Sequence, residues 1–507
     1  MFSYAYSGDI RGVESFLVKI EVDIADGLPG FDIVGSVSNE VREARDRVRV
    51  AMRNSGYSIP VKHMTVNLSP AGIRKSNTGF DLPLALCILQ SMDIISPDAL
   101  SGTFFAGEMM LSGEVRSTPG ILPMLLAAKA AGLRRCVVPK ANEEEAIIVE
   151  GINVYGVRSL NEAVMFLNGA LNIEPVGKMS IDEFRSEQRY ESDFADVYGQ
   201  PVAKRGLEIA AAGMHNVLMV GPPGAGKSML ARCLPSILPP LSPDECLEVS
   251  SVYSVAGLKR NGHGLITCRP FVTPHHSTTV SALIGGGVIP RPGAVSYADK
   301  GVLFLDEFPE FPRHVLESLR QPLEDRKVRV ARNADICTFP ADFMLVAAMN
   351  PCPCGNWPDR GKCRCTDAER TRYIGKISGP LLDRMDICLN AEKIMPSELM
   401  NSPENISDTS EVIRNRVLAA HEIQKDRFKD SGILFNSQMG NKEIDKYCRL
   451  SPDVGKILET LALKHDMSTR SYFRVLRIAR TIADLSERDN IEAEHIIEAV
   501  RLKSNYR

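Results

Sequence analysis

The sequence predicts an α/β protein of about three domains, because 507 residues are too many for one hydrophobic core. Three observations predict this class. Residues 193–390 alternate strand and helix patterns, as expected of a parallel sheet. Residues 1–170 mix strand and helix patterns and predict an α+β domain, whereas residues 441–507 carry helical periodicity and predict a small helical lid. We expect a polar linker at 171–192 and a connecting segment at 391–440.

The first domain shows its elements by the spacing of apolar residues. Apolar side chains alternate along residues 16–24, which predicts a strand, and recur at helical spacing over 41–52 before Gly56 ends that pattern. A second strand is predicted at 65–68. Residues 82–92 are apolar enough to predict a buried helix.

Composition limits where this chain can act. The net charge is −3, so the surface as a whole does not attract nucleic acid or anionic membranes, and any such contact must be local. No apolar run approaches the roughly 18 residues of a membrane span, and the start lacks the pattern of a secretory signal. The twelve cysteines therefore indicate a reducing, cytoplasmic location, where clustered cysteines suggest metal binding.

A complete phosphate-binding motif follows an apolar strand at 216–220. The motif G-x-x-x-x-G-K-[ST] is formed by Gly221, Pro222, Pro223, Gly224, Ala225, Gly226, Lys227 and Ser228. Its small residues allow backbone N–H groups to surround phosphates at a helix N-terminus. We expect Lys227 to reach the β- and γ-phosphates of ATP and Ser228 to bind Mg²⁺. A chance glycine-rich loop does not explain the strand, loop and helix together.

Two further apolar strands end in polar residues. Residues 301–305 precede Asp306 and Glu307, at the edge where α/β sheets bind ligands. We assign Asp306 to Mg²⁺ and Glu307 to polarising the attacking water. Residues 343–349 precede Asn350, which can hold that water beside the γ-phosphate; the alternative is an Asx turn into Pro351.

A cysteine cluster follows this last strand. Cys352, Cys354, Cys363 and Cys365 can close a tetrahedral, structural Zn²⁺ site, whereas reduced structural cysteines or a redox-labile pair are the alternatives. The adjacent His275 and His276 diverge in an extended segment, so one metal would rarely take both. A loop or DNA-facing role suits them better.

Several segments around these motifs resemble those of AAA+ proteins. Asp196–Gln200 resembles the segment lining the adenine pocket, with Tyr198 and Gln200 as its candidates. Leu381–Asp386 resembles the arginine-finger segment of magnesium chelatases, and Ser468–Arg470 resembles sensor 2. Over its whole length the chain resembles the ComM/YifB family of magnesium-chelatase-like AAA+ proteins. The segments that carry this likeness are Tyr4–Ala5, Gly27–Phe31, Gly79–Pro83, Gly285–Gly287, Pro274–His276, Asn350–Gly355 and Ala479–Leu485.

The resemblance implies a ring hexamer with ATP between subunits. Arg384 would then act in trans on the neighbour's γ-phosphate; the alternative is a structural ion pair with Asp383 or Asp386. Arg470 is the sensor 2 candidate and Arg474 its substitute. The sequence leaves open whether Arg470 acts in cis or in trans.

In ComM relatives the activity is DNA helicase work, chiefly branch migration during uptake and recombination of transforming DNA. Arg291 lies in a glycine-rich loop in the position of the helix-2 insertion. Lys327, Arg329 and Arg332 alternate with apolar residues, so a β-hairpin would place all three cations on one face. The alternative is an ordinary solvated hairpin face.

The N-terminal domain resembles the Lon protease (S5-type) fold, which raises peptidase activity as a rival function. Gly79 stands where the nucleophilic serine is needed and Leu122 at or near the lysine, while Ser76 and Thr78 are out of register. Without nucleophile and base, acyl transfer has no route. We therefore expect a ring-assembly or DNA-gripping domain. For the whole chain, the alternative to a DNA motor is a magnesium-chelatase-like or protein-remodelling ATPase without helicase activity.

Overall fold

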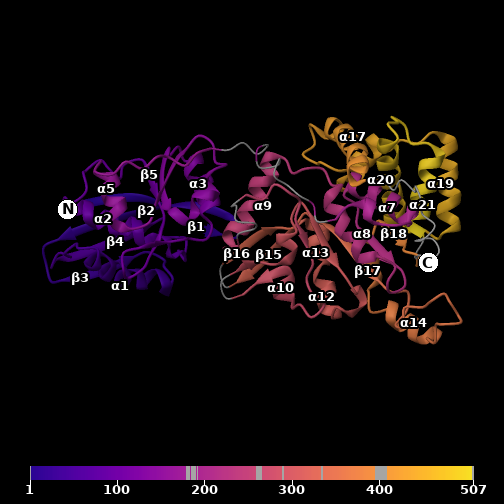
Figure 1. The fold of residues 1–507 in the computed structure, drawn as a ribbon, viewed down its shortest axis with the longest axis horizontal. Coiled ribbons are helices and arrows are strands. Elements are labelled where there is room, and N and C mark those ends of the chain that lie inside the picture. The colour runs from indigo at the N-terminus through magenta and orange to yellow at the C-terminus, as the bar shows by residue number, and fades with distance from the viewer. Residues whose placement is uncertain are drawn as a thin grey trace.

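The computed structural model describes residues 2–178, 183, 190, 192–258, 265–287, 290–332, 335–393 and 408–504. Three regions follow one another along the long axis of the molecule (Figure 1). The N-terminal α+β region lies at one end, the parallel sheet in the middle and the helical region at the other end. This is the α/β class that the sequence predicts.

The N-terminal region is built on a seven-stranded mixed sheet of order β3-β4-β2-β1-β5-β8-β9. β2 pairs antiparallel with β1 and β4, and the other neighbours run parallel. Its strands are β1 (Phe2–Arg11), β2 (Glu14–Ala25), β3 (Gly30–Val34), β4 (His63–Ser69), β5 (Thr103–Phe105), β8 (Arg135–Pro139) and β9 (Asn153–Val157). A small ladder joins β6 (Glu108–Met109) and β7 (Val115–Arg116). The predicted strand at 16–24 is confirmed within β2, whose alternate residues are buried.

Helices cover this sheet, and their ends follow local signals. The first helix begins at Ser38, whose hydroxyl accepts a hydrogen bond from the Val41 N–H, and ends before Gly56. The second is buried on nearly every side, as its unbroken apolar sequence predicts. The helices of this region are η1 (Thr78–Phe80), α1 (Asn39–Asn54), α2 (Asp81–Ser91), α3 (Ile121–Ala130), η2 (Lys140–Asn142), α4 (Glu143–Ala146) and α5 (Leu160–Leu167).

The central region is a five-stranded sheet of order β11-β14-β17-β10-β18, with every neighbouring pair parallel. The strands are β10 (Val217–Val220), β11 (Phe271–Val272), β14 (Val302–Leu305), β17 (Met344–Met349) and β18 (Ile387–Asn390). All residues of β14 and β17 are buried, which explains their continuous apolar runs. Two hairpins project from this core: β12 (Gly285–Gly286) with β13 (Arg291–Pro292), and β15 (Lys327–Arg332) with β16 (Asp335–Pro340).

Short helices connect these strands, several with capping residues. The helices are η3 (Phe194–Asp196), α7 (Pro201–Gly213), α8 (Lys227–Cys233), η4 (Leu234–Ser236), α9 (Pro243–Val255), α10 (Val280–Ile284), α11 (Ala294–Tyr297), η5 (Phe308–Glu310), α12 (Arg313–Ser318), α13 (Arg320–Asp325), α14 (Asp367–Ile374) and α15 (Gly379–Leu382). Ser242 and Glu245 form a reciprocal capping box at the start of α9, as Thr366 and Glu369 do at α14.

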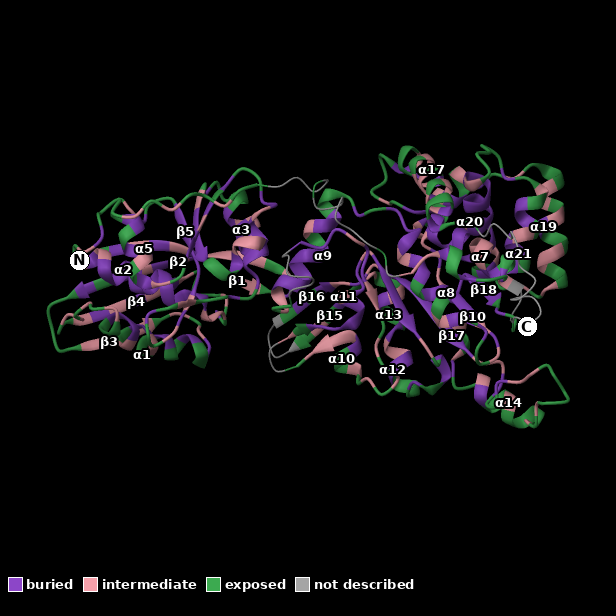
Figure 2. Cartoon of the chain, in the orientation of Figure 1, coloured by how far each residue is buried: buried purple, intermediate pink, exposed green. Residues whose placement is uncertain are grey.

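The helical region contains α17 (Ser410–Phe428), η6 (Asn436–Gln438), α18 (Asn441–Tyr447), α19 (Pro452–Lys464), α20 (Thr469–Leu485) and α21 (Ala493–Ser504). α17 lies within the expected connecting segment, yet it packs against α7 and α20, so helical packing extends N-terminal to residue 441. At the end of the molecule α19 exposes most of its surface (Figure 2).

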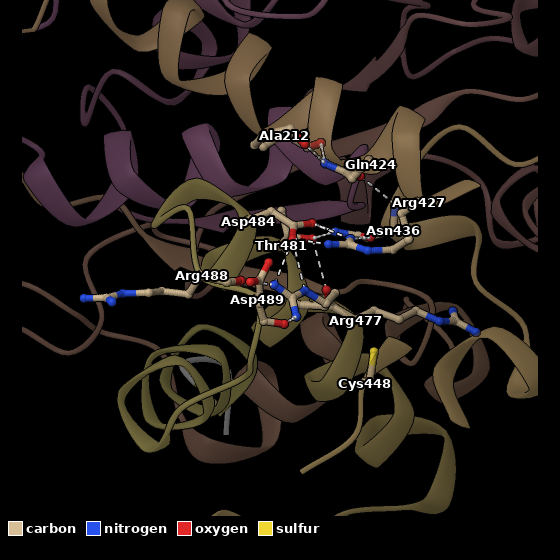
Figure 3. A network of polar contacts seen from close by, with 12 residues as sticks. Ala212, Gln424, Arg427, Asn436, Cys448, Arg477, Thr481, Asp484, Arg488 and Asp489 are labelled. Carbon is tan, nitrogen blue, oxygen red and sulfur yellow. Dashed lines mark hydrogen bonds and ion pairs between the residues drawn. The ribbon is translucent and has the colours of Figure 1, made fainter. Parts of the chain in front are cut away.

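A buried polar network holds the helical region on the central one (Figure 3). Asp484 of α20 accepts hydrogen bonds from Arg427, Arg480 and Asn436. Gln424 of α17 donates to the Ala212 carbonyl of α7 at 2.9 Å. Because paired buried charges are costly to unpair, these ion pairs fix α17 on α20, and the Gln424 hydrogen bond ties α17 to α7.

The N-terminal region packs directly on the central one. Helix α3 lies against α9, and both contribute to one buried apolar cluster. The Gly120 N–H donates to the Ser254 carbonyl at 2.8 Å, and Ser254 Oγ also contacts Glu145. Within the described residues, no helix is long and apolar enough to cross a membrane.

Candidate ATP site and arginine pocket

The phosphate-binding motif forms the expected strand, loop and helix. β10 leads into the loop and α8 begins at Lys227, while Gly224 and Gly226 take positive φ angles of 77° and 79° that suit glycine. Lys227 Nζ donates to the Gly221 carbonyl at 2.6 Å and to Asn350 Oδ1 at 3.1 Å. Burial lowers the pKa of Lys227, and the Asp306 carboxylate opposes that shift. A cation and an amide therefore meet where the sequence places the γ-phosphate.

Hydroxyl and carboxylate oxygens gather on the same edge of the sheet. Ser228 Oγ donates to Asp306 Oδ2 at 2.7 Å, although the two residues are far apart in the chain. Oxygen donors of this kind suit Mg²⁺, so the pair fits the predicted metal role. Glu307 follows with φ of 51°, and its Oε2 lies 3.3 Å from His276 Nδ1.

Gln200 lies beside the phosphate loop, and Tyr198 lies near it in the chain. Gln200 Nε2 donates to the Ala225 carbonyl at 3.3 Å, and its Oε1 accepts from the Glu392 N–H at 3.2 Å. Gln200 thus ties the loop to the chain that follows β18. Tyr198 is 56% exposed, so its ring is accessible for stacking on a base.

The four predicted cysteines converge in the loop after Asn350. Their sulfurs all lie within 4.8 Å of one another, and Cys352 Sγ is 3.4 Å from Cys354 Sγ and 3.7 Å from Cys363 Sγ. A tetrahedral Zn²⁺ with bonds of about 2.3 Å would hold its sulfurs about 3.8 Å apart. Hydrogen bonds from the Asn356 and Arg364 backbone lower the pKa of Cys354 to about 6, which favours a thiolate. The cluster therefore fits a structural zinc ion, with Cys365 as the fourth ligand.

The predicted arginines lie at the opposite edge of the central sheet, in a cavity of about 600 Å³ between this sheet and the helical region. Arg384 is buried and donates through Nη1 to the Pro380 carbonyl at 2.6 Å and through Nη2 to Glu324. Arg470 Nη2 donates to the same Glu324 oxygen at 2.9 Å. Arg384, Arg470 and the substitute Arg474 all line this one cavity.

Arg384 forms its ion pair with neither of the partners that the sequence suggested, Asp383 or Asp386. Its partner is Glu324, whereas Asp386 lies 3.5 Å from Arg474 and accepts from the Asn216 N–H. Burial raises the pKa of Asp386, but Arg474 and His215 outweigh it and hold that pKa well below its usual range. Asp386 is therefore a structural anion paired with Arg474.

Comparison with known proteins now places the chain. The family model described as magnesium chelatase, subunit ChlI, matches residues 193–399, and its C-terminal counterpart matches residues 407–503. A third, subunit ChlI of Mg-chelatase, matches residues 20–142. Competence protein ComM of Haemophilus influenzae is 40% identical over 505 residues, covering 99% of this chain and 97% of ComM. The chain belongs to the ComM/YifB family of magnesium-chelatase-like AAA+ ATPases.

Two other relatives support this placement. YifB of Escherichia coli is 38% identical over 496 residues, covering 97% of this chain and 95% of YifB. Lon protease 2 of Bacillus subtilis is 28% identical over 212 residues, covering 37% of this chain and 38% of the protease. The likeness to Lon agrees with the N-terminal fold that the sequence predicts.

The cations expected to contact DNA in this ComM/YifB chain lie on the two hairpins. Lys327 and Arg329 are exposed on β15 with buried Val328 between them, so they share one face. Arg291 is exposed on β13, and its partner strand β12 lies against β15. The backbone of Arg332 belongs to β15, while its side chain lies outside the described part of the chain.

The Lon-like positions carry no peptidase constellation in the described geometry. Gly79 is buried, and a Cβ there would meet Thr118 Cγ2 at 2.8 Å. Leu122 is buried in the apolar cluster of α3. Thr78 Oγ1 donates to Glu108, and Ser76 is exposed. The absence of peptidase activity stays a prediction.

Two further residues belong to these sites, although no sequence motif assigns them there. His276 is the neighbour of Glu307, although its pattern suggested a loop or DNA-facing role, and its ring also lies edge-on to Phe311. Glu324 holds both Arg384 and Arg470. Neither has a motif that assigns a partner, because both contacts depend on tertiary packing.

Proposed function

We propose that this chain is an ATP-driven DNA motor that works as a homo-hexameric ring, with each ATP lying between two subunits. The observation that carries the proposal is the separation of two groups of residues. Lys227, Ser228 and Asp306 lie after the carboxyl ends of their strands, whereas Arg384 precedes the amino end of β18.

This separation supports action between subunits. β18 has four residues and runs parallel to β10, so the two edges are roughly 13 Å apart at about 3.3 Å per residue. An arginine at one edge does not reach a phosphate bound at the other edge of its own sheet. A neighbouring copy that brings its phosphate loop to the arginine pocket would complete the site.

Arg470 lines the same cavity as Arg384. It shares the Glu324 oxygen with Arg384, so both guanidinium groups face one cavity. We therefore propose that Arg470, like Arg384, acts in trans on the neighbour's triphosphate. Such arginines stabilise the charge of the transition state.

The DNA half of the proposal rests on the hairpins and on family membership. ComM of Haemophilus influenzae carries competence in its name. Lys327 and Arg329 share an exposed face, and a ring would repeat this face around its channel. Repeated phosphate contacts release counterions, so DNA affinity should fall steeply as salt rises.

The direct test measures ATP hydrolysis with Mg²⁺, with and without forked DNA, together with unwinding of a labelled branched substrate. We expect DNA to stimulate hydrolysis and strands to separate. Glu307→Gln should bind ATP but not turn it over. Absence of both stimulation and unwinding would reject the DNA motor in favour of a magnesium-chelatase-like or protein-remodelling ATPase.

The hairpin is tested separately. Lys327→Ala with Arg329→Ala should weaken DNA affinity and reduce its dependence on salt, while hydrolysis without DNA persists. Binding of fluorescent DNA at several salt concentrations measures both effects. Unchanged affinity would remove the hairpin from the proposed DNA contact.

Trans action has a complementation test. Arg384→Ala and Lys227→Ala chains should each lose about 10³-fold or more of their hydrolysis rate. A mixture should recover activity, because an Arg384→Ala subunit still offers an intact phosphate loop to the intact arginine of a Lys227→Ala neighbour. If the mixture stays inactive while mixed rings form, Arg384 acts in cis or only structurally.

A further inference from the structure

One carboxylate connects the arginine pocket to the hairpin proposed to contact DNA. Glu324 lies near the end of α13, and β15 begins three residues later at Lys327. Its Oε1 accepts hydrogen bonds from both Arg384 and Arg470. A single side chain therefore spans two parts of the proposed motor.

The two arginines differ in how firmly they are held. The Arg384 side chain is 6% exposed, whereas the side chains of Arg470 and Glu324 are 52% and 47% exposed. Burial lowers the pKa of Arg384, whereas the negative charge of Glu324 works in the opposite direction. Arg384 Nε is buried and has no hydrogen-bond partner within the described residues. One donor of this guanidinium is thus unpaired among the described residues, while Nη1 and Nη2 are held by the Pro380 carbonyl and Glu324.

The other carboxylates of the cavity are engaged elsewhere. Asp386 pairs with Arg474, and Asp342 lies 3.2 Å from Lys300 and 3.5 Å from Arg326. Within the described residues, Glu324 is the cavity's carboxylate paired with Arg384 and Arg470. A triphosphate that reaches these arginines competes with Glu324 for the same donors.

Because Glu324 lies so close to β15 in the chain, its displacement by a triphosphate would also affect the hairpin. Arg326, between Glu324 and β15, has a positive φ of 53°, and its carbonyl accepts from the Ala341 N–H after β16. The start of β15 and the end of β16 are therefore joined directly after Glu324. α13 also packs on β15.

We propose that Glu324 is a positioning residue that clasps Arg384 and Arg470 until the neighbour's ATP displaces it, and that this release frees the base of the β15–β16 hairpin. The inference rests on the proposed action of both arginines between subunits. It adds the step by which ATP bound to one subunit changes the DNA-contacting hairpin of the next.

The test compares Glu324→Gln with Asp325→Asn in the full chain. Both changes remove one carboxylate at adjacent positions of α13, but Asp325 accepts a hydrogen bond from Gln321 Nε2 at 3.2 Å and, within the described residues, is not paired with Arg384 or Arg470. Each is combined with Glu307→Gln so that ATP stays bound. Hydrogen exchange of the β15 and β16 amides is then measured with and without ATP and Mg²⁺.

With Glu324 present, ATP should raise hairpin exchange, and Asp325→Asn should behave in the same way. With Glu324→Gln, exchange should already be raised without ATP and change little when ATP is added. In the chain that retains Glu307, Glu324→Gln should lower the KM for ATP on the order of tenfold, because one charge-assisted competitor is gone. A merely structural role would instead raise KM and lower kcat.

Two results would overturn the clasp: an ATP response that is the same with Glu324→Gln as with Asp325→Asn, or no ATP response in the hairpin at all. Neither readout uses DNA. If the exchange results are as expected but DNA neither stimulates hydrolysis nor is unwound, the clasp stands and the proposed DNA function fails.

Discussion

At the scale of single residues, Asp299 shows how burial changes the chemistry of a carboxyl group. Its Oδ1 accepts the Asp342 N–H at 2.7 Å, and its Oδ2 has no partner within the described residues. Burial raises the pKa of Asp299 from 3.8 to about 8, against the opposing charge of Lys300. The folded chain therefore keeps a proton here that the unfolded chain has lost, across the window between these values.

This proton makes stability depend on pH in a definite direction. The pKa of Asp299 is higher in the folded chain than in the unfolded chain. Its contribution to the free energy of unfolding is therefore fully present below about pH 4 and is lost as the pH rises through about 8. Asp299→Asn should flatten the decline of Tm between these limits and make the protein more stable than wild type at pH 8. Thermal unfolding at a series of pH values checks this, with exposed Asp98→Asn as the control. A decline as steep as that of wild type would contradict the assignment.

Residues differ in how far the sequence could predict their partners. Lys227, Ser228, Asp306 and Glu307 belong to motifs whose order along alternating strands predicts that they meet at one edge. Glu324 belongs to no such motif, and its partners Arg384 and Arg470 lie 60 and 146 residues away in the chain. Its contacts follow from the way the helical region packs on the sheet, which no local pattern specifies.

At the scale of elements, the cysteine loop packs directly against the phosphate-binding loop. Cys352 follows Asn350 by two residues, and a Cβ on Gly355 would come within 2.5 Å of Pro223 in the phosphate loop. Cys352→Ser should therefore remove bound zinc and raise the KM for ATP several-fold, because Asn350 and Pro223 lose a rigid neighbour. Metal analysis of purified protein and steady-state hydrolysis measure the two effects.

The matched control for the loop is Cys136→Ser, since Cys136 is buried in β8 of the N-terminal sheet, away from the cluster. It should keep both the metal and the KM of wild type. Wild-type protein without stoichiometric metal, or Cys352→Ser protein with as much metal as wild type, would contradict the zinc assignment.

Elements with one dominant signal were predictable, and those with mixed signals were not. β14 and β17 are buried on both faces, and their unbroken apolar runs indicate this directly. α17 follows a segment rich in Pro, Ser, Asn and acids, and it carries charged residues along most of its length. The packing of α17 on α7 and α20 compensates for its weak pattern, and only the folded chain contains that information.

At the scale of the whole molecule, the polar linker does not keep the N-terminal region apart. The apolar cluster shared by α3 and α9 joins the two regions, and the turn between β1 and β2 makes a second contact. Gly12 in this turn has φ of 71°, and Val13 packs on the apolar cluster that includes Val328 and Phe339. The sequence predicts a domain boundary at residues 171–192, but it does not predict that the surfaces on either side of this segment pack together.

The contact of Gly12 with the hairpin predicts that the N-terminal region restrains the β15–β16 segment. A Cβ at Gly12 would lie 2.7 Å from the Thr338 carbonyl oxygen, whereas a Cβ at Gly132, with φ of 84°, would meet no atom of the described residues within 4 Å. Gly132→Ala should cost about 1 kcal/mol in the free energy of unfolding, because it places a side chain in the left-handed region, and Gly12→Ala should cost more, because its side chain also meets the Thr338 backbone. Only Gly12→Ala should also raise hydrogen exchange in β16, since the turn must withdraw from Thr338. Equal protection of β16 in the two variants would show that the contact does not restrain the hairpin.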